Sequence, residues 1–437
     1  MGRLTARLAA ACAVAVLLLT AAAPGSPVLG FTGFGASSAD ATYGQSMTFR
    51  VGLAGGAPDR LELLLRFTGS DATLVVPVQA GGDAAEYVWD AADRYVTPNT
   101  RISYRWRATT GHTVRLSPEG TLLYDDDRPG LDWQSAVIGR ATVHWYGGAE
   151  GVARRFGDLT ADGAARAEAL LGHEMAGPVD IFVYEARDDF FGALGPGARE
   201  WFGAATFPEL RTIFMWLGGG SSDYLETTIV HEVTHVVFSD ATDNPLHSPA
   251  KWLNEGLATW AETQSADLQR AVVQAEADDR GLFSFEAISY DFPFGTRGAT
   301  LSYAMGTTMV DMLIGEHGPE AIARLAEAYR NGASDAEALE AAAGEPADAL
   351  YAAYYDAFGA DEPQPVEAAP ILPSNVRKPG DGPSGPDGPG ATPAPAPGPG
   401  AENDGMPAWI FVAIVVVVAV AAGGGWLLMR RSQEPPA

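Results

Sequence analysis

The sequence has almost no cysteine and few basic residues. Cys12 is its single thiol, so no disulfide can form within the chain. The 28 Lys and Arg residues stand against 55 Asp and Glu residues, which gives a net charge of −27 at pH 7. Nucleic-acid binding needs a basic face, so we expect no nucleic-acid partner. The acidic residues are spread along the chain, which indicates solubility rather than one specific site.

The first segment, residues 1–29, has the features of an export signal. Arg3 and Arg7 form a short basic start, the apolar run Leu8–Ala23 follows, and small residues then offer cleavage sites. Because Cys12 lies inside this segment, the mature protein is expected to contain no thiol. An uncleaved N-terminal anchor is the alternative.

The other end of the chain predicts a membrane anchor. Residues 407–429 are uncharged and mostly apolar, and about 20 such residues cross a bilayer as a helix. A buried helix of a soluble protein would need a polar face, which this segment lacks. Arg430 and Arg431 follow directly, and positive charge stays in the cytoplasm. We therefore expect one span, a cytoplasmic tail at 430–437 and an N-terminal ectodomain outside the cell membrane.

Residues 360–406, before this span, are dense in Pro, Gly, Asp and Ala. Such a composition cannot bury enough apolar surface to fold, so we expect a disordered stalk.

Residues 30–127 show short alternating segments separated by Gly-, Asp- and Pro-rich breaks, for example 47–53 and 102–108. This pattern predicts a small β-sandwich of the immunoglobulin or fibronectin kind. Trp89, Tyr104 and Trp106 are candidates for carbohydrate or partner contacts, but aromatic residues more often fill the core of such a sandwich.

The pattern changes at about residue 133 and predicts an α/β start with a helical second half, to residue 358. Buried strands are expected at 141–146, 179–184 and 212–217. Residues 161–171 are Ala- and Leu-rich and indicate a helix, and Asp223 is expected to cap the helix that follows the third strand. The chain as a whole is predicted to be α+β.

That helix carries His231-Glu232-Val233-Thr234-His235, an HExxH motif. Residues four apart on a helix lie one above the other, so His231 and His235 share one face and Glu232 lies beside whatever they hold. The motif alone is a weak signal. A catalytic zinc needs three protein ligands and an open position, and Glu255, from a neighbouring helix, can supply the third ligand.

We expect one Zn²⁺ per chain, bound by His231, His235 and Glu255, that lowers the pKa of a water molecule. Glu232 is then the expected general base. Asp240 or Asp243 are candidates to orient a ligand histidine, and Glu262 is expected to be a solvated end of its helix rather than a fourth ligand.

Three motifs together resemble the gluzincin metallopeptidases, and most closely the bacterial peptidase MA-like family, related to the zinc aminopeptidases and thermolysin. They are 231–235, Trp252-Leu253-Asn254-Glu255-Gly256-Leu257-Ala258, and Ser302-Tyr303-Ala304-Met305-Gly306. The resemblance covers residues 133–358. It implies that Tyr303 opens a helix facing the metal and donates a hydrogen bond to the oxyanion of the reaction.

Two departures separate the chain from the aminopeptidase branch. The segment between His235 and Glu255 is one residue longer, which a loop can absorb. The Gly-x-Met-Glu-Asn strand, whose glutamate holds the substrate's amino terminus, is absent; its nearest counterpart, 214–219, has no acid. Strand 212–217 is expected to be the sheet edge along the cleft, where its backbone can pair with an extended substrate.

The sequence therefore favours a membrane-anchored extracellular zinc metallopeptidase acting on a peptide or protein substrate, and an endopeptidase before an aminopeptidase. The alternative is a zinc-binding, non-catalytic cell-surface interaction module, against which the intact Glu232 and Tyr303 speak. A structural or adhesive surface protein with an accidental HExxH is a third interpretation.

Overall fold

The computed structural model describes residues 30–70, 72–195, 203–293, 296–361 and 363. The predicted export signal, the span at 407–429 and the tail lie outside these residues, as does nearly all of the predicted stalk. Within the described ranges, no helix is long and apolar enough to cross a membrane. All of the described residues fall in one compact unit, Met1–Glu367.

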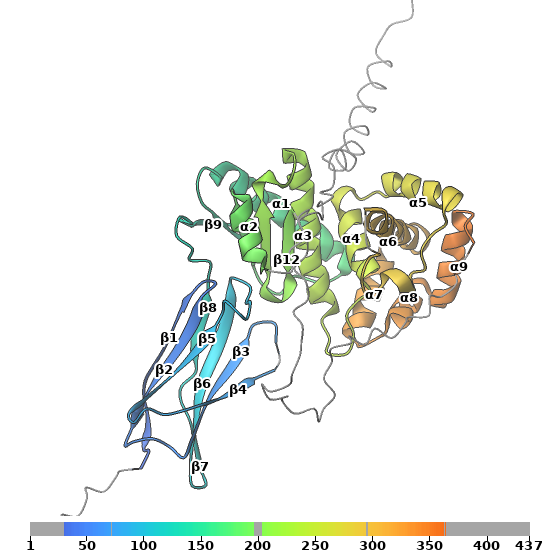
Figure 1. Ribbon diagram of the computed structural model, residues 1–437. Coiled ribbons are helices and arrows are strands. Elements are labelled where there is room, and N and C mark those ends of the chain that lie inside the picture. Colours follow the sequence, from blue (N-terminus) through green and yellow to red (C-terminus); the bar gives the residue numbers. More distant parts are fainter. Residues whose placement is uncertain (1–29, 71, 196–202, 294–295, 362, 364–437) are drawn as a thin grey trace, which may run out of the picture. The chain divides into compact units, whose positions relative to one another are not determined.

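The N-terminal part consists of two antiparallel sheets (Figure 1). The first has the order β1 (Gly33–Thr42), β2 (Ser46–Ala54), β5 (Ala84–Asp90). The second has the order β4 (Leu74–Val78), β3 (Arg60–Phe67), β6 (Thr100–Thr110), β7 (Thr113–Leu116), and β8 (Gly120–Tyr124) also pairs with β6. Side chains alternate along β6, and its inward-facing Tyr104 and Trp106 are buried in the core that both sheets share. Trp89 packs against the same core.

A mixed sheet follows, in the order β12 (Ala204–Phe207), β13 (Thr212–Trp216), β11 (Val179–Tyr184), β10 (Ala141–Trp145), β9 (Gln134–Ile138). The three central strands are parallel and both edge strands are antiparallel. Parallel strands covered on both faces read as continuous apolar runs, which is why the sequence predicts these three.

The prediction that 212–217 is the edge strand is wrong. β13 is covered on its outer side by β12, which therefore forms the edge. The sequence of β12, Ala-Ala-Thr-Phe, is too short and too poor in large apolar residues to predict a strand.

Helices cover both faces of this sheet. α1 (Glu150–Leu171) and α3 (Ser222–Thr242) pack on one face through Phe156, Ile229 and Val233, and α2 (Arg187–Leu194) packs on the other through Phe190. The remaining described α-helices form the second half (Figure 1): α4 (Lys251–Thr263), α5 (Asp267–Asp279), α6 (Thr296–His317), α7 (Glu320–Arg330), α8 (Asp335–Ala343) and α9 (Ala347–Ala357). The α+β class predicted from the sequence is confirmed.

Two details of the helices differ from expectation. α1 begins at Glu150, well before the predicted residue 161, and its earlier turns include glycine and exposed charged residues. The cap of α3 is Ser221, whose hydroxyl accepts a hydrogen bond from the amide of Tyr224; Asp223 is not the cap. Asp223 lies in the first turn instead, where its negative charge still favours the helix N-terminus.

Candidate metal centre

His231 and His235 lie on the same face of α3, as their spacing predicts. Their ring centroids are 4.7 Å apart and the ring planes are nearly perpendicular, at 84°. α3 is anchored by its apolar residues against the sheet and α1, so the position of this histidine pair is fixed by the core.

Glu255, on α4, completes a group of three. Its Oε2 lies 3.4 Å from His231 Nε2 and 3.6 Å from His235 Nε2. One ligand atom from each residue lies within 4.8 Å of the other two. Atoms about 2.0–2.2 Å from a tetrahedral zinc lie about 3.4 Å from one another. The two distances to Glu255 match this spacing, so the three side chains could hold a zinc ion.

Each histidine ring is also held by its second nitrogen. His231 Nδ1 lies 2.9 Å from Glu262 Oε1, and His235 Nδ1 lies 2.9 Å from Asn254 Oδ1. A carboxylate and an amide oxygen only accept, so both Nδ1 atoms donate a proton. In the neutral form of each ring, Nε2 is then the atom that carries the lone pair a metal would take.

Helix α4 thus supplies the third ligand and both partners of the histidines. The expectation that Glu262 is only a solvated helix end is wrong, because its carboxylate bonds His231. Asp240, a candidate to orient a ligand histidine, has other partners: its carboxylate pairs with Arg211 and accepts from the amide of Ala176. Glu255 and Glu262 are seven residues apart on one helix face, and that spacing was the available signal.

The charges of this group are strongly coupled. Burial alone would raise the pKa of Glu255, but hydrogen bonds with His231 and His235 hold it well below its usual value. Burial alone would lower the pKa of His231, but hydrogen bonds with Glu255 and Glu262 hold it well above its usual value. The carboxylate of Glu255 is therefore ionised at neutral pH, as a ligand of a divalent cation should be.

Two glycines bring α4 and α6 into close contact. A Cβ atom added to Gly256 would overlap the main chain of Gly306, and one added to Gly306 would overlap the carbonyl of Trp252. Only glycine lets two backbones approach so closely. The contact carries Tyr303, on α6, to the ligand Glu255, on α4.

Tyr303 faces the group of three. The expectation that it begins a helix is wrong, because it lies inside α6, which begins at Thr296. Its ring centroid is 6.4 Å from that of His231, and Phe292 packs against it edge-on. Burial raises the pKa of the Tyr303 phenol well above its usual value, and its hydrogen bond with Glu255 raises it further. The hydroxyl therefore keeps its proton at neutral pH and can donate it.

Glu232 is nearly buried, with 9% of its surface exposed. Its Oε2 accepts a hydrogen bond of 2.6 Å from the hydroxyl of Thr206, on the edge strand β12. The carboxylate of the predicted base thus contacts the edge strand of the sheet.

One comparison with known proteins finds a family match within this chain. Residues 160–357 match the Peptidase MA superfamily. The resemblance to a gluzincin-like peptidase family is thereby confirmed, and the peptidase MA domain contains His231, Glu232, His235, Glu255 and Tyr303.

No curated protein matches the chain in sequence. Among solved structures, a mutant zinc metallopeptidase of the M1 family from Deinococcus radiodurans is 14% identical, covering 74% of this chain and 91% of its own, with a TM-score of 0.34. The Br derivative of BhCBM56 is 9% identical, covering 20% of this chain and 88% of its own, with a TM-score of 0.17. A GH family 64 laminaripentaose-producing β-1,3-glucanase from Paenibacillus barengoltzii is 16% identical, covering 27% of this chain and 28% of its own, with a TM-score of 0.16. Likenesses at these TM-scores assign neither fold nor activity.

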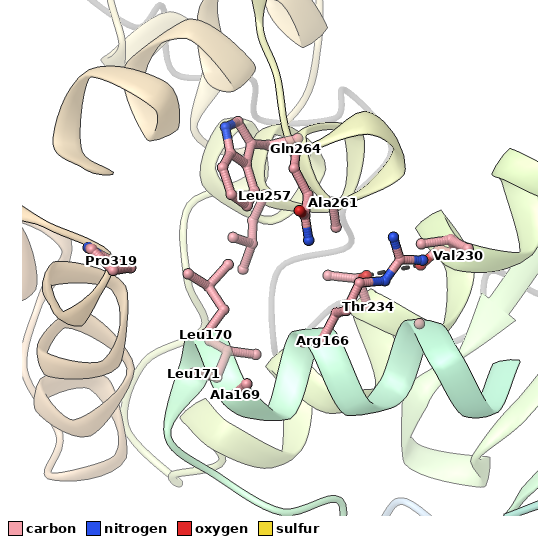
Figure 2. A pocket seen from close by; sticks show the side chains of 13 residues that line it. Arg166, Ala169, Leu170, Leu171, Val230, Thr234, Leu257, Ala261, Gln264 and Pro319 are labelled. Carbon is pink, nitrogen blue, oxygen red and sulfur yellow. Dashed lines mark hydrogen bonds between the residues drawn. The ribbon is translucent and has the colours of Figure 1, made fainter. Parts of the chain in front are cut away.

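The peptidase MA domain also has an apolar cavity of about 250 Å³ (Figure 2). Val230 and Thr234 of α3, Leu257 and Ala261 of α4, and Leu170 of α1 line part of it. No histidine or carboxylate lines it, so it does not have the groups for metal binding or proton transfer. The group that could hold a metal consists of His231, His235 and Glu255, and we call it the triad.

Proposed function

We propose that the protein is a zinc-dependent metallopeptidase whose active site is the triad with Glu232 and Tyr303. The observation that carries this proposal is the convergence of three ligand atoms, with both histidine rings oriented by Glu262 and Asn254. Zinc bound there supplies a Lewis acid that makes water a nucleophile near neutral pH. The match of residues 160–357 to the Peptidase MA superfamily supports this chemistry.

Glu232 is the proposed general base. It follows the proposed ligand His231 directly, and its carboxylate accepts a hydrogen bond from Thr206 of β12. It takes a proton from the attacking water and passes it to the leaving amine. A carboxylate does both because it accepts a proton in the first step and gives it back in the second.

Tyr303 is the proposed donor to the oxyanion. Its protonated phenol faces the same group of ligands from α6. A donor aimed at charge that develops only during the reaction stabilises the transition state more than the bound substrate.

The edge strand β12 is the proposed docking element for the substrate. Among the described strands, β12 pairs only with β13, which leaves its other side open to an extended peptide. Its four residues, Ala-Ala-Thr-Phe, include no acid that could hold a free amino terminus. We therefore propose cleavage within a polypeptide rather than removal of single N-terminal residues.

We also propose a location for the protein, on the outside of the cell membrane. The export signal at 1–29, the span at 407–429 and the arginines Arg430 and Arg431 support an extracellular peptidase anchored by one C-terminal helix.

A digest of a peptide library by the purified protein tests the function. We expect internal cleavage by wild type and a loss of about 10²- to 10⁴-fold in Glu232→Gln, which removes the base and leaves the ligands in place. A zinc-loaded wild type that cleaves nothing would favour the alternative, a zinc-binding interaction module.

A further inference from the structure

Thr206 contacts the proposed base from a different element of the fold. Its Oγ1 donates to Glu232 Oε2 at 2.6 Å and lies 3.3 Å from the main-chain carbonyl oxygen of the same residue. A hydroxyl has one proton, and the shorter contact to the charged carboxylate is the stronger bond. Among the residues that the structure describes, no other side chain forms a hydrogen bond with the Glu232 carboxylate.

The pleat of β12 fixes where this hydroxyl points. Successive side chains of a strand face opposite sides of the sheet. Phe207 and Ala205 pack with Phe214 on one face, while Ala204 packs into the core on the face that α3 covers. Thr206 lies on the same face as Ala204. The pairing of Thr206 with Ile213 in β13 fixes the register of β12 at this residue. The hydroxyl is therefore held by the sheet, and not by α3 itself.

A hydroxyl group is a better hydrogen-bond partner for a catalytic base than a cationic side chain is. A Lys or Arg partner would stabilise the ionised carboxylate strongly and weaken it as a proton acceptor. A threonine hydroxyl fixes the carboxylate plane through one oxygen and leaves Oε1 to exchange a proton with substrate and water. It remains a donor to Oε2 in both protonation states of the base.

We propose that Thr206 is a positioning residue that holds the Glu232 carboxylate in its reactive orientation from the edge strand. This inference rests on the proposed peptidase function. It also links the strand that would bind the substrate to the group that moves the proton, so that a shift of β12 moves the carboxylate with it.

Two substitutions separate the hydroxyl from the packing. Thr206→Val keeps the β-branched shape and removes the donor, whereas Thr206→Ser keeps the donor and removes one methyl group. Thr242→Val is the control, because Thr242 is the last residue of α3 and its hydroxyl bonds the carbonyl of Phe238 rather than Glu232.

The first readout is peptide hydrolysis by the zinc-loaded proteins. For Thr206→Val we expect kcat to fall about 10- to 100-fold, the range for losing one hydrogen bond to a charged group, with KM within about twofold of wild type. Thr206→Ser should recover most of kcat, and Thr242→Val should match wild type. Equal losses in the valine and serine variants, or a wild-type kcat in Thr206→Val, would overturn the proposal.

The second readout does not depend on activity. Crystal structures of wild type, Thr206→Val and Thr206→Ser show the orientation of the Glu232 carboxylate directly. We expect it to rotate in the valine variant and to stay in place in the serine variant. An unchanged carboxylate in Thr206→Val refutes the role of Thr206, even if no peptide substrate is found. Absence of hydrolysis in wild type, with the expected rotation in the variant, refutes the peptidase function instead.

Discussion

Each residue around the triad has a distinct physical task. In the proposed zinc site, His231, His235 and Glu255 would bind the metal, and Glu262 and Asn254 hold the two rings through Nδ1. Such partners set both the direction and the basicity of a ligand imidazole. The two tasks can be separated by substitution, because the partners do not point at the metal position themselves.

Glu262→Gln is expected to weaken zinc binding without abolishing it. The amide can still accept from His231 Nδ1 but carries no charge to support the ring, so zinc affinity should fall about 10- to 100-fold. A competition titration with a chelator measures this. Glu286→Gln, an exposed glutamate on the segment Glu286–Ile288, is the control and should bind zinc like wild type. Unaltered zinc affinity in Glu262→Gln would mean that the charge of this carboxylate does not contribute to zinc binding.

Tyr303→Phe removes one hydroxyl and keeps the aromatic packing against Phe292. Loss of one donor to the oxyanion typically costs about 10²- to 10³-fold in kcat. Zinc content and melting temperature should stay close to wild type, because the ring still fills its place. Steady-state kinetics with a cleaved peptide checks this. A variant that turns over as fast as wild type would make Tyr303 a packing residue.

At the scale of secondary structure, the contact between α4 and α6 brings two parts of the proposed site together. Gly256 and Gly306 allow the two backbones to meet, and this meeting brings Glu255 and Tyr303 together. The relative position of the proposed ligand and the proposed oxyanion donor therefore depends on this helix contact. Neither glycine takes part in the proposed chemistry.

Gly256→Ala is expected to push the two helices apart. The added methyl group overlaps the main chain of Gly306, which cannot move as a side-chain end would. Overpacking of this kind costs about 1–3 kcal/mol in the free energy of unfolding. Zinc affinity should also fall because Glu255 is displaced. Denaturant unfolding and zinc titration measure both effects.

Gly315→Ala, on the neighbouring helix α6, is the control for Gly256→Ala. A Cβ atom there meets nothing within 4 Å, so the variant should be as stable as wild type or more stable by about 0.5–1 kcal/mol. If Gly256→Ala were as stable as this control, the close helix contact would be wrong.

The sequence predicted what depends on local spacing and missed what depends on distant pairing. His231 and His235 follow from the helical period, and the buried parallel strands from their continuous apolar runs. The edge strand β12 was missed because edge position is a property of strand pairing, and Ala204 and Ala205 give no local signal. Glu262 lay on the correct helix face, but the period of α4 does not reveal that this face meets His231.

At the scale of the whole chain, the peptidase MA domain follows two N-terminal sheets that have their own core. Hydrogen bonds join these sheets to the mixed sheet: Asn99 donates to Asp180 and to Thr212, and the hydroxyl of Tyr43 donates to the carbonyl of Gly192. Asn99 is buried at this contact, and its side-chain amide is satisfied by both hydrogen bonds.

The proposed orientation in the membrane can be tested with a tag after Ala437. The arginines that follow residues 407–429 are expected to keep the C-terminus in the cytoplasm. The tag should then be protected in intact cells, while an antibody against the N-terminal sheets labels the cell surface. A tag that is accessible outside would refute the charge argument.

The zinc content of the purified protein tests the central claim most directly. Elemental analysis should find about one zinc per chain in wild type and in Glu232→Gln, in which all three ligands remain. Glu255→Ala and His231→Ala should lose the metal, because two remaining ligands do not hold zinc tightly. Zinc near zero in carefully prepared wild type, or retained at one per chain in Glu255→Ala, would contradict the account.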